Sequence, residues 1–402
     1  MSTLSCLCIL PPELLQLIIQ HLSQADLYHL CALSRNIYEE VVLALYRDVE
    51  LSRTNFKQLL TWANQMVGPN NIGQKTCSLS LPSQVNLIAG LGNDDDLMEQ
   101  LSDLLPRAMK SLVNLKVLAI VPPVAYSSLL KVYHISSADL LDCGFHLHTF
   151  SYNWDGVRWA GSLFRFLAEQ SNICNLAIGE MVDSDEDAPD VLPRLSVATV
   201  IYRAGVLSRI LKTIAARYLR RLRLEIIVSR SNDHITAALH YLATVNATLT
   251  HLYIGSEYVP FTAEVNHAGT LKTIGSCFPN LTFLRYLNIR ILDREPSPWK
   301  WQSFPRALSA FKLLEILQLA VDTSGRQKPI DASQTHACGL VERCMTTCPT
   351  LHLVAVTVVG RRFKGGEQPR DYTAFPRTSG STFQLGFEKS RPIGDDAWRE
   401  VM

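Results

Sequence analysis

Residues 10–51 read LPPELLQLIIQHLSQADLYHLCALSRNIYEEVVLALYRDVEL, and the rest of the chain is organised around this stretch. Its two prolines suit the first turn of a helix, where a missing backbone N–H removes no hydrogen bond. Ser23 and Asp26 then have the spacing of a capping box, which predicts that a second helix begins there. Apolar residues at helical spacing continue to the end of the stretch, so the pattern predicts three short helices.

The first of these helices carries more apolar surface than one small core can bury. A three-helix unit of roughly forty residues is also too small to be robust on its own. We therefore expect the rest of the chain, or another protein, to complete it. The apolar residues of this helix are Leu14, Leu15, Leu17, Ile18, Ile19 and Leu22.

The same pattern resembles an F-box, which has a Leu-Pro, a Glu, an apolar helix and an Asp-Leu that opens the second helix. The matching residues are Leu10, Pro11, Glu13, Leu14, Ile18, Leu22, Asp26, Leu27, Leu30, Leu33 and Ser34. Many F-boxes end in Trp, whereas this chain has Leu45, Tyr46, Arg47 and Val49. The alternative interpretation is that the helices only cap the first edge of a repeat array, because terminal repeats need a cover.

A second pattern, in which an apolar residue is followed three and five positions later by two others, recurs about ten times after residue 76. In one copy these positions are Leu284, Leu287 and Ile289. The pattern is the strand half of a leucine-rich repeat, and segments with helical periodicity lie between the copies. The copies begin at Leu115, Leu147, Ile173, Leu219, Leu249, Leu284, Leu314 and Leu351, with weaker versions at Cys77 and Leu195.

These patterns predict an α/β chain in which a three-helix F-box precedes an irregular leucine-rich-repeat solenoid. Parallel strands should form the concave face of the solenoid and helices its convex face. The expected organisation is an F-box at 1–51, a connecting helix and link at 52–75, repeats at 76–360 and a tail of low order at 361–402.

Composition limits the partners and the compartment. A hydrophobic content of 47% is ample for a packed core, and the net charge of +1 gives no global attraction for nucleic acid or an anionic membrane. No apolar run is long enough to span a bilayer, and the ten cysteines are scattered. We therefore expect a cytoplasmic or nuclear protein with no nucleic-acid or membrane partner.

No phosphate loop, paired-His metalloprotease motif or nucleophile elbow is present, so we expect no enzymatic activity. His336, Cys338, Cys344 and Cys348 could suggest zinc. Cys338, Val341, Met345 and Cys348 follow helical spacing, however, and paired Cys-x-x-Cys knuckles are absent. This favours a buried helix face, and we expect no metal site and no cofactor.

An F-box joined to leucine-rich repeats resembles the substrate receptors of SCF-type (Skp, cullin, F-box) ubiquitin ligases. The resemblance implies that the F-box binds a Skp-type adaptor and, through it, a cullin, while the repeats capture the protein to be ubiquitinated. The alternatives are an F-box protein with a non-degradative role and a plain repeat scaffold. The surface expected to contact the adaptor comprises Leu10, Pro11, Leu14, Ile18, Leu22, Leu27 and Leu30.

Residues between the repeat leucines should face the concave sheet, and there they gain polar and aromatic character in the later strands. Tyr and Arg are enriched at binding hot spots, and arginines offer bidentate hydrogen bonds to a carboxylate or phosphate. We therefore expect an acidic or phosphorylated target to bind there, although outward residues of a sheet can also simply be solvated. The expected target-binding residues are Ser151, Asn153, Arg221, Arg223, His251, Tyr253, Tyr286, Asn288, Arg290 and Gln318.

Overall fold

The chain forms two compact units, Met1–Arg194 and Leu195–Met402. The boundary falls inside the expected repeat domain, so each half of that domain is described by itself. The structure is a computed structural model that describes residues 10–19, 21–31, 35–69, 71–86, 94–121, 132–135, 137–152, 160–179, 191–203, 214, 217–228, 232–245, 248–255, 267–290, 302–322, 334–359 and 372–376.

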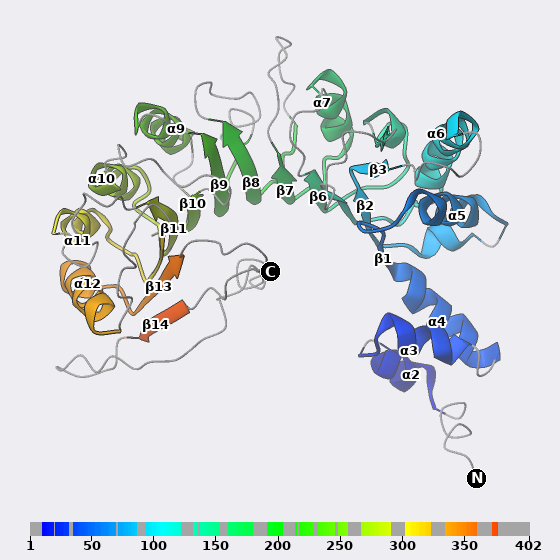
Figure 1. Ribbon diagram of the computed structural model, residues 1–402, viewed down its shortest axis with the longest axis horizontal. Coiled ribbons are helices and arrows are strands. Elements are labelled where there is room, and N and C mark those ends of the chain that lie inside the picture. Colours follow the sequence, from blue (N-terminus) through cyan, green and yellow to red (C-terminus); the bar gives the residue numbers. More distant parts are fainter. Residues whose placement is uncertain are drawn as a thin grey trace. The chain divides into compact units, whose positions relative to one another are not determined.

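The first unit begins with three helices, which we call the head: α2 (Pro12–Ile19), α3 (Gln24–Cys31) and α4 (Arg35–Arg47) (Figure 1). The predicted cap of α3 is present, because the Ser23 hydroxyl donates to Asp26 Oδ2 at 2.6 Å and the Asp26 N–H donates to Ser23 Oγ at 3.2 Å. The three-helix expectation for this stretch is therefore confirmed.

Strands and helices alternate through the rest of the first unit, and the strand order β1-β2-β4-β6-β7 is parallel throughout. A small antiparallel pair, β3 with β5, was not expected from the sequence. The elements are β1 (Asp48–Glu50), α5 (Phe56–Val67), η1 (Ile72–Lys75), β2 (Ser78–Pro82), β3 (Gln84–Asn86), α6 (Asp94–Ser111), β4 (Val117–Val121), β5 (Val132–His134), η2 (Ser137–Leu140), β6 (Thr149–Tyr152), α7 (Ala160–Glu169) and β7 (Asn175–Ile178).

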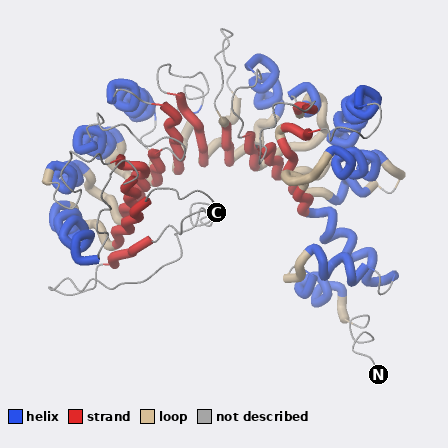
Figure 2. Tube along the Cα trace, in the orientation of Figure 1, coloured by secondary structure: helices blue, strands red, loops and turns tan. Residues whose placement is uncertain are grey.

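The second unit repeats the same arrangement, with strands β8 to β13 parallel and in chain order. Figure 2 shows the helices of this unit along one side of its strands. The elements are β8 (Val197–Arg203), β9 (Arg221–Val228), α9 (Asn232–Val245), β10 (His251–Gly255), α10 (His267–Cys277), β11 (Phe283–Arg290), α11 (Ser303–Ala307), η4 (Leu308–Ala310), β12 (Ile316–Asp322), α12 (Gln334–Thr347), β13 (Leu353–Val359) and β14 (Tyr372–Pro376).

The repeat residues lie in register and face the helices. Leu222 of β9 pairs with Leu252 of β10, which pairs with Leu284 of β11, and all three are buried. At the strand starts the backbone forms a further ladder, in which the Thr250 N–H donates to Arg220 O and the Thr282 N–H to Thr250 O, both at 2.9 Å. Buried leucines in one row and paired backbone groups in the next are what hold a leucine-rich-repeat layer together.

One repeat has a different phase from the one that the sequence suggested. The pairing matches Leu284 to Leu252 and Tyr286 to Ile254, and Leu281, three residues before Leu284, is buried. The repeat is therefore Leu281, Leu284 and Tyr286, and the assignment to Leu284, Leu287 and Ile289 is wrong. Tyr286 occupies a position where the neighbouring repeats have an aliphatic residue, and the sequence pattern was therefore assigned three residues too late.

The expectation of low order over 361–402 fails at one place. Tyr372–Pro376 forms strand β14, which pairs antiparallel with β13 from Leu353↔Pro376 to Thr357↔Tyr372. Its alternation of Tyr, Thr, Ala and Phe is compatible with a strand, although the pattern is short. This part of the predicted tail is therefore the last strand of the second unit's sheet, and the remainder of the tail lies outside the described residues.

Candidate functional site

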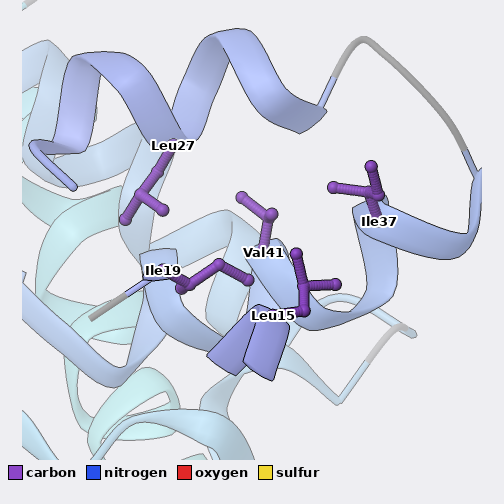
Figure 3. Packing of buried hydrophobic residues seen from close by; sticks show 5 residues of the cluster. All are labelled: Leu15, Ile19, Leu27, Ile37 and Val41. Carbon is purple, nitrogen blue, oxygen red and sulfur yellow. The ribbon is translucent and has the colours of Figure 1, made fainter. Parts of the chain in front are cut away.

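The apolar residues of the head form two groups, one buried in its core and one exposed. Leu15 and Ile19 of α2 point toward Leu27 of α3 and toward Ile37 and Val41 of α4 (Figure 3). All five are buried, and they form the contact that fixes the three helices together.

The other apolar residues of α2 remain exposed. Leu14 is 48% exposed, Leu17 54% and Ile18 39%. At about 100° per residue, Leu14 and Ile18 lie roughly a quarter to a third of a turn away from Leu15 and Ile19, and Leu17 lies roughly half a turn away. The helix therefore has two apolar faces, of which the described part of the chain covers one, and the exposed face is a candidate interaction surface.

Of the residues expected to contact the adaptor, some are exposed and others are buried. Pro11, Leu14 and Ile18 are exposed as expected, and Leu10 is partly buried. The inclusion of Leu27 is wrong, because it is 6% exposed and belongs to the core of the head. Leu22 and Leu30 are partly buried and pack against the same core. Leu17 was not included, although the spacing of Leu14, Leu17 and Ile18 could have placed it on the same helix face.

In the second unit, the face of the sheet away from the helices carries a row of large polar and aromatic side chains. The Arg223 guanidinium lies 4.4 Å from the centroid of the Tyr253 ring, and the Arg285 guanidinium lies 4.9 Å from it. Arg223 also forms an ion pair of 2.6 Å with Glu225. Two arginines therefore stack on one tyrosine across three strands, an arrangement stabilised by cation–π attraction.

A second row on the same face lies two residues earlier along each strand. The His251 ring stacks on the Phe283 ring, with a centroid distance of 5.5 Å and an interplanar angle of 22°. Thr250 Oγ1 lies 2.9 Å from His251 Nδ1. Burial, with a smaller contribution from the positive charge of Arg221, lowers the pKa of His251 to about 4, so the imidazole is neutral at pH 7.

These side chains do not line an open face, contrary to the expectation. Tyr253 and Gln318 are each 1% exposed, and Arg221 is also buried. Arg223 and His251 are partly buried. A target could reach the buried side chains of this set only if their surroundings rearranged, so the role of the set in binding stays a prediction. Ser151 of β6, in the first unit, is partly buried and pairs with Ala119 and Ala177, which add no polar group beside it.

Tyr286 faces the helices and not the opposite side of the sheet, so its expected position on the binding face is wrong. It is fully buried, and its hydroxyl lies 3.0 Å from His267 Nδ1 of α10. Burial lowers the pKa of His267 to about 4 and raises the pKa of the Tyr286 hydroxyl, so both groups are neutral at pH 7. The pair therefore fastens a helix to a strand.

The change of phase in β11 also explains what the sequence missed. Arg285 pairs with Tyr253 and Gln318, and thus occupies the outward row that Tyr286 was expected to occupy. The spacing of Leu281, Leu284 and Tyr286 could have identified it. The side chains of Asn288 and Arg290 lie outside the described part of the structure, as does Asn153 as a whole.

Neither a cluster of metal ligands nor a membrane-spanning helix is present among the described residues. No three His, Cys, Asp or Glu side chains there gather closely enough to hold a metal ion. Cys344 and Cys348 are buried with Val341 and Met345 in the core, and burial raises the pKa of the Cys344 thiol to about 12. No described helix combines the length and the apolar composition that a bilayer crossing requires.

Comparison with known proteins gives a distant structural likeness. No protein-family model matches the chain, and no curated protein matches it. Among solved structures, the chain is similar to the crystal structure of an internalin (inlF) from Listeria monocytogenes, with 12% sequence identity and a TM-score of 0.30. The alignment covers 77% of this chain and 95% of the internalin. Because this similarity is low, the repeats are assigned from the pairing of the strands and not from the internalin.

Proposed function

We propose that this protein is the substrate-recognition subunit of an SCF-type ubiquitin ligase. In this proposal the head binds a Skp-type adaptor that is itself bound to a cullin, and the repeat units capture the target protein. The subunit contributes no catalytic residue. It holds the target near the conjugating enzyme, which replaces a rare bimolecular encounter with an oriented one. Such a complex would act in the cytoplasm or the nucleus.

One observation carries the proposal, namely the exposed apolar face of α2 formed by Leu14, Leu17 and Ile18. A helix that only capped a repeat array would have its apolar residues turned toward the array and polar residues turned outward. Here the head already has its own core, and three large aliphatic side chains remain on a second face. Their burial by a partner would be favourable by about 25 cal/mol per Å² of apolar surface.

The test is adaptor capture by a charged variant of this face. The double variant Leu14→Glu and Ile18→Glu places two carboxylates at the centre of the proposed interface, where burial of an unpaired charge is strongly unfavourable. We expect affinity for a purified Skp-type adaptor to fall by about a hundredfold, which corresponds to about 3 kcal/mol. Biolayer interferometry with immobilised adaptor measures this change.

A matched control separates the specific effect from the general effect of added charge. Val113 and Leu313 are 45% and 47% exposed, close to Leu14 and Ile18, but they lie outside the head. The double variant Val113→Glu and Leu313→Glu should keep wild-type affinity. If the α2 variant keeps its circular dichroism spectrum and still binds the adaptor like wild type, the proposal is refuted.

A repeat scaffold is the second candidate, and one observation favours it. The head continues directly into the sheet, because α4 is followed by β1 and the Cys77 N–H donates to Arg47 O at 2.8 Å. Helices joined in this way could cover the first strand without binding any adaptor. Co-purification of a Skp-type adaptor and a cullin with the full chain distinguishes the two, since a scaffold brings neither. Ubiquitin-dependent turnover of a captured protein would then separate the ligase from a non-degradative F-box protein.

A further inference from the structure

A hollow of about 400 Å³ lies in the first unit, at a place that the proposed function does not use. It is bordered by the end of α5, by η1 and by the second half of α6. Met66 of α5 is buried and contributes to its lining. The other residues that matter for its chemistry are Gly68, Asn71, Gln74, Arg107, Lys110 and Val113.

Close contacts hold the walls of the hollow in place. Gly73 lies against Ser111 so tightly that an added Cβ would overlap the Ser111 side chain, which is why η1 can approach α6 at this point. The Asn114 side-chain amide donates to Gln74 O at 2.7 Å and fastens η1 to the residues after α6. A site whose walls are already fixed loses little conformational entropy when a ligand binds.

The charge of the hollow is positive. Arg107 and Lys110 are exposed, lie three residues apart on α6 and line the same wall. None of the described lining residues is acidic, and Asp103, one turn earlier on α6, does not line the hollow. The described residues provide no ion-pair partner for Arg107 or Lys110. Both cations are therefore available to an anionic group.

The hollow also has an apolar part, which a site for a bare anion would not need. Met66 is buried in its lining, and Val113 at its edge is 45% exposed. We propose that this hollow binds a short acidic protein segment, with a carboxylate or phosphate at Arg107 and Lys110 and a neighbouring apolar side chain at Val113. The side-chain amide of Asn71, also in the lining, would be available to the backbone of such a segment. This inference does not depend on adaptor binding by the head.

Three fluorescein-labelled nine-residue peptide mixtures test it, each with leucine followed by a fixed central residue and random residues elsewhere. The central residue is phosphoserine, glutamate or glutamine, and fluorescence anisotropy with the full chain measures binding. Two exposed charge pairs of ordinary strength together correspond to about a tenfold change in affinity. We therefore expect the double variant Arg107→Gln and Lys110→Gln to bind the phosphoserine mixture about tenfold more weakly, and wild type to bind the glutamine mixture least.

Two further variants make the test specific. Arg53→Gln with Lys116→Gln removes the same charge from exposed residues outside the hollow and should bind like wild type. A fourth mixture, with glycine in place of leucine before the phosphoserine, should bind wild type more weakly than the leucine mixture, and Val113→Ser should remove this difference. Equal weakening in the two charge variants would overturn the proposal, because it would show a general charge effect. Absence of binding by all three mixtures, or competition by inorganic phosphate at the peptide's own concentration, would also overturn it.

Discussion

Two helical glycines in the second unit should respond in opposite directions to the same substitution. Gly275 of α10 is buried, and a Cβ added there would lie 2.8 Å from Ala310 Cβ and 3.0 Å from the Ala310 carbonyl carbon. Gly339 of α12 has room, because among the described residues its added Cβ would meet only Arg343 Nη1, at an ordinary 3.6 Å. The missing side chain at Gly275 is what lets α10 approach η4 closely.

The expected magnitudes follow from these distances. Replacing glycine by alanine inside a helix stabilises it by about 1 kcal/mol, because alanine loses less backbone entropy. At Gly339 nothing opposes this gain, so Gly339→Ala should stabilise α12 by up to about 1 kcal/mol. At Gly275 the crowding against Ala310 costs about 1–3 kcal/mol, as overpacking of a core does, so Gly275→Ala should be neutral or destabilising by up to about 2 kcal/mol.

Hydrogen exchange measured by mass spectrometry can follow each helix separately, which suits a chain with two compact units. Peptides from α10 should exchange as fast as or faster than wild type in Gly275→Ala, and peptides from α12 should exchange more slowly in Gly339→Ala. The reasoning would be refuted if both substitutions slowed exchange in their own helices to the same extent. That result would mean that the close approach of α10 to η4 does not constrain the packing.

Three other outcomes can be measured. Leu27→Ala should destabilise the head by about 2–5 kcal/mol through loss of core packing, seen as faster proteolysis of residues 10–47. Asn55→Ala removes the capping box of α5, in which Gln58 N–H donates to Asn55 Oδ1 at 3.0 Å, and should cost about 1 kcal/mol by hydrogen exchange. Burial lowers the pKa of His267 to about 4, so the unfolded chain binds more protons than the folded chain below pH 6.5. The thermal midpoint of the second unit should therefore decrease as the pH is lowered from 6.5 to 4, and it should decrease less in His267→Gln.

The strands could be predicted from the sequence because buried apolar residues alternate in them with residues of the opposite face. Nearly every copy of the repeat pattern lies in a strand or directly before one, and residues such as Leu118 and Leu317 are fully buried. Segments with helical periodicity were expected between the copies, and helices such as α6 lie there. Single-sequence reasoning failed at β11, where Tyr286 stands in place of an aliphatic residue. The hydroxyl of Tyr286 can be buried because it has a hydrogen-bonding partner, His267, and that partner is distant in sequence.

The candidate sites were less predictable, for a different physical reason. Helical spacing gives the faces of α2, but it does not tell which apolar face meets the other helices of the head. Leu14 and Leu15 are neighbours in sequence and similar in chemistry, yet one is exposed and the other belongs to the core. The hollow beside α6 depends on the approach of η1, which no periodicity describes. Such sites become visible only when distant segments are placed together.

The existing ion pairs of the basic residues indicate which of them would bind an acidic segment most strongly. On the outward face of the second unit, Arg223 already has Glu225 at 2.6 Å and Tyr253 beneath its guanidinium, so a new anion would compete with contacts that exist. Desolvation and rearrangement of that buried pair would offset much of the new attraction. Arg107 and Lys110 are exposed and have no ion-pair partner among the described residues, so nothing comparable is lost when an anion binds them. We therefore expect an acidic peptide to lose more affinity when the charges of the hollow are neutralised than when Arg223→Gln is introduced, and the reverse order in the anisotropy assay would contradict this argument.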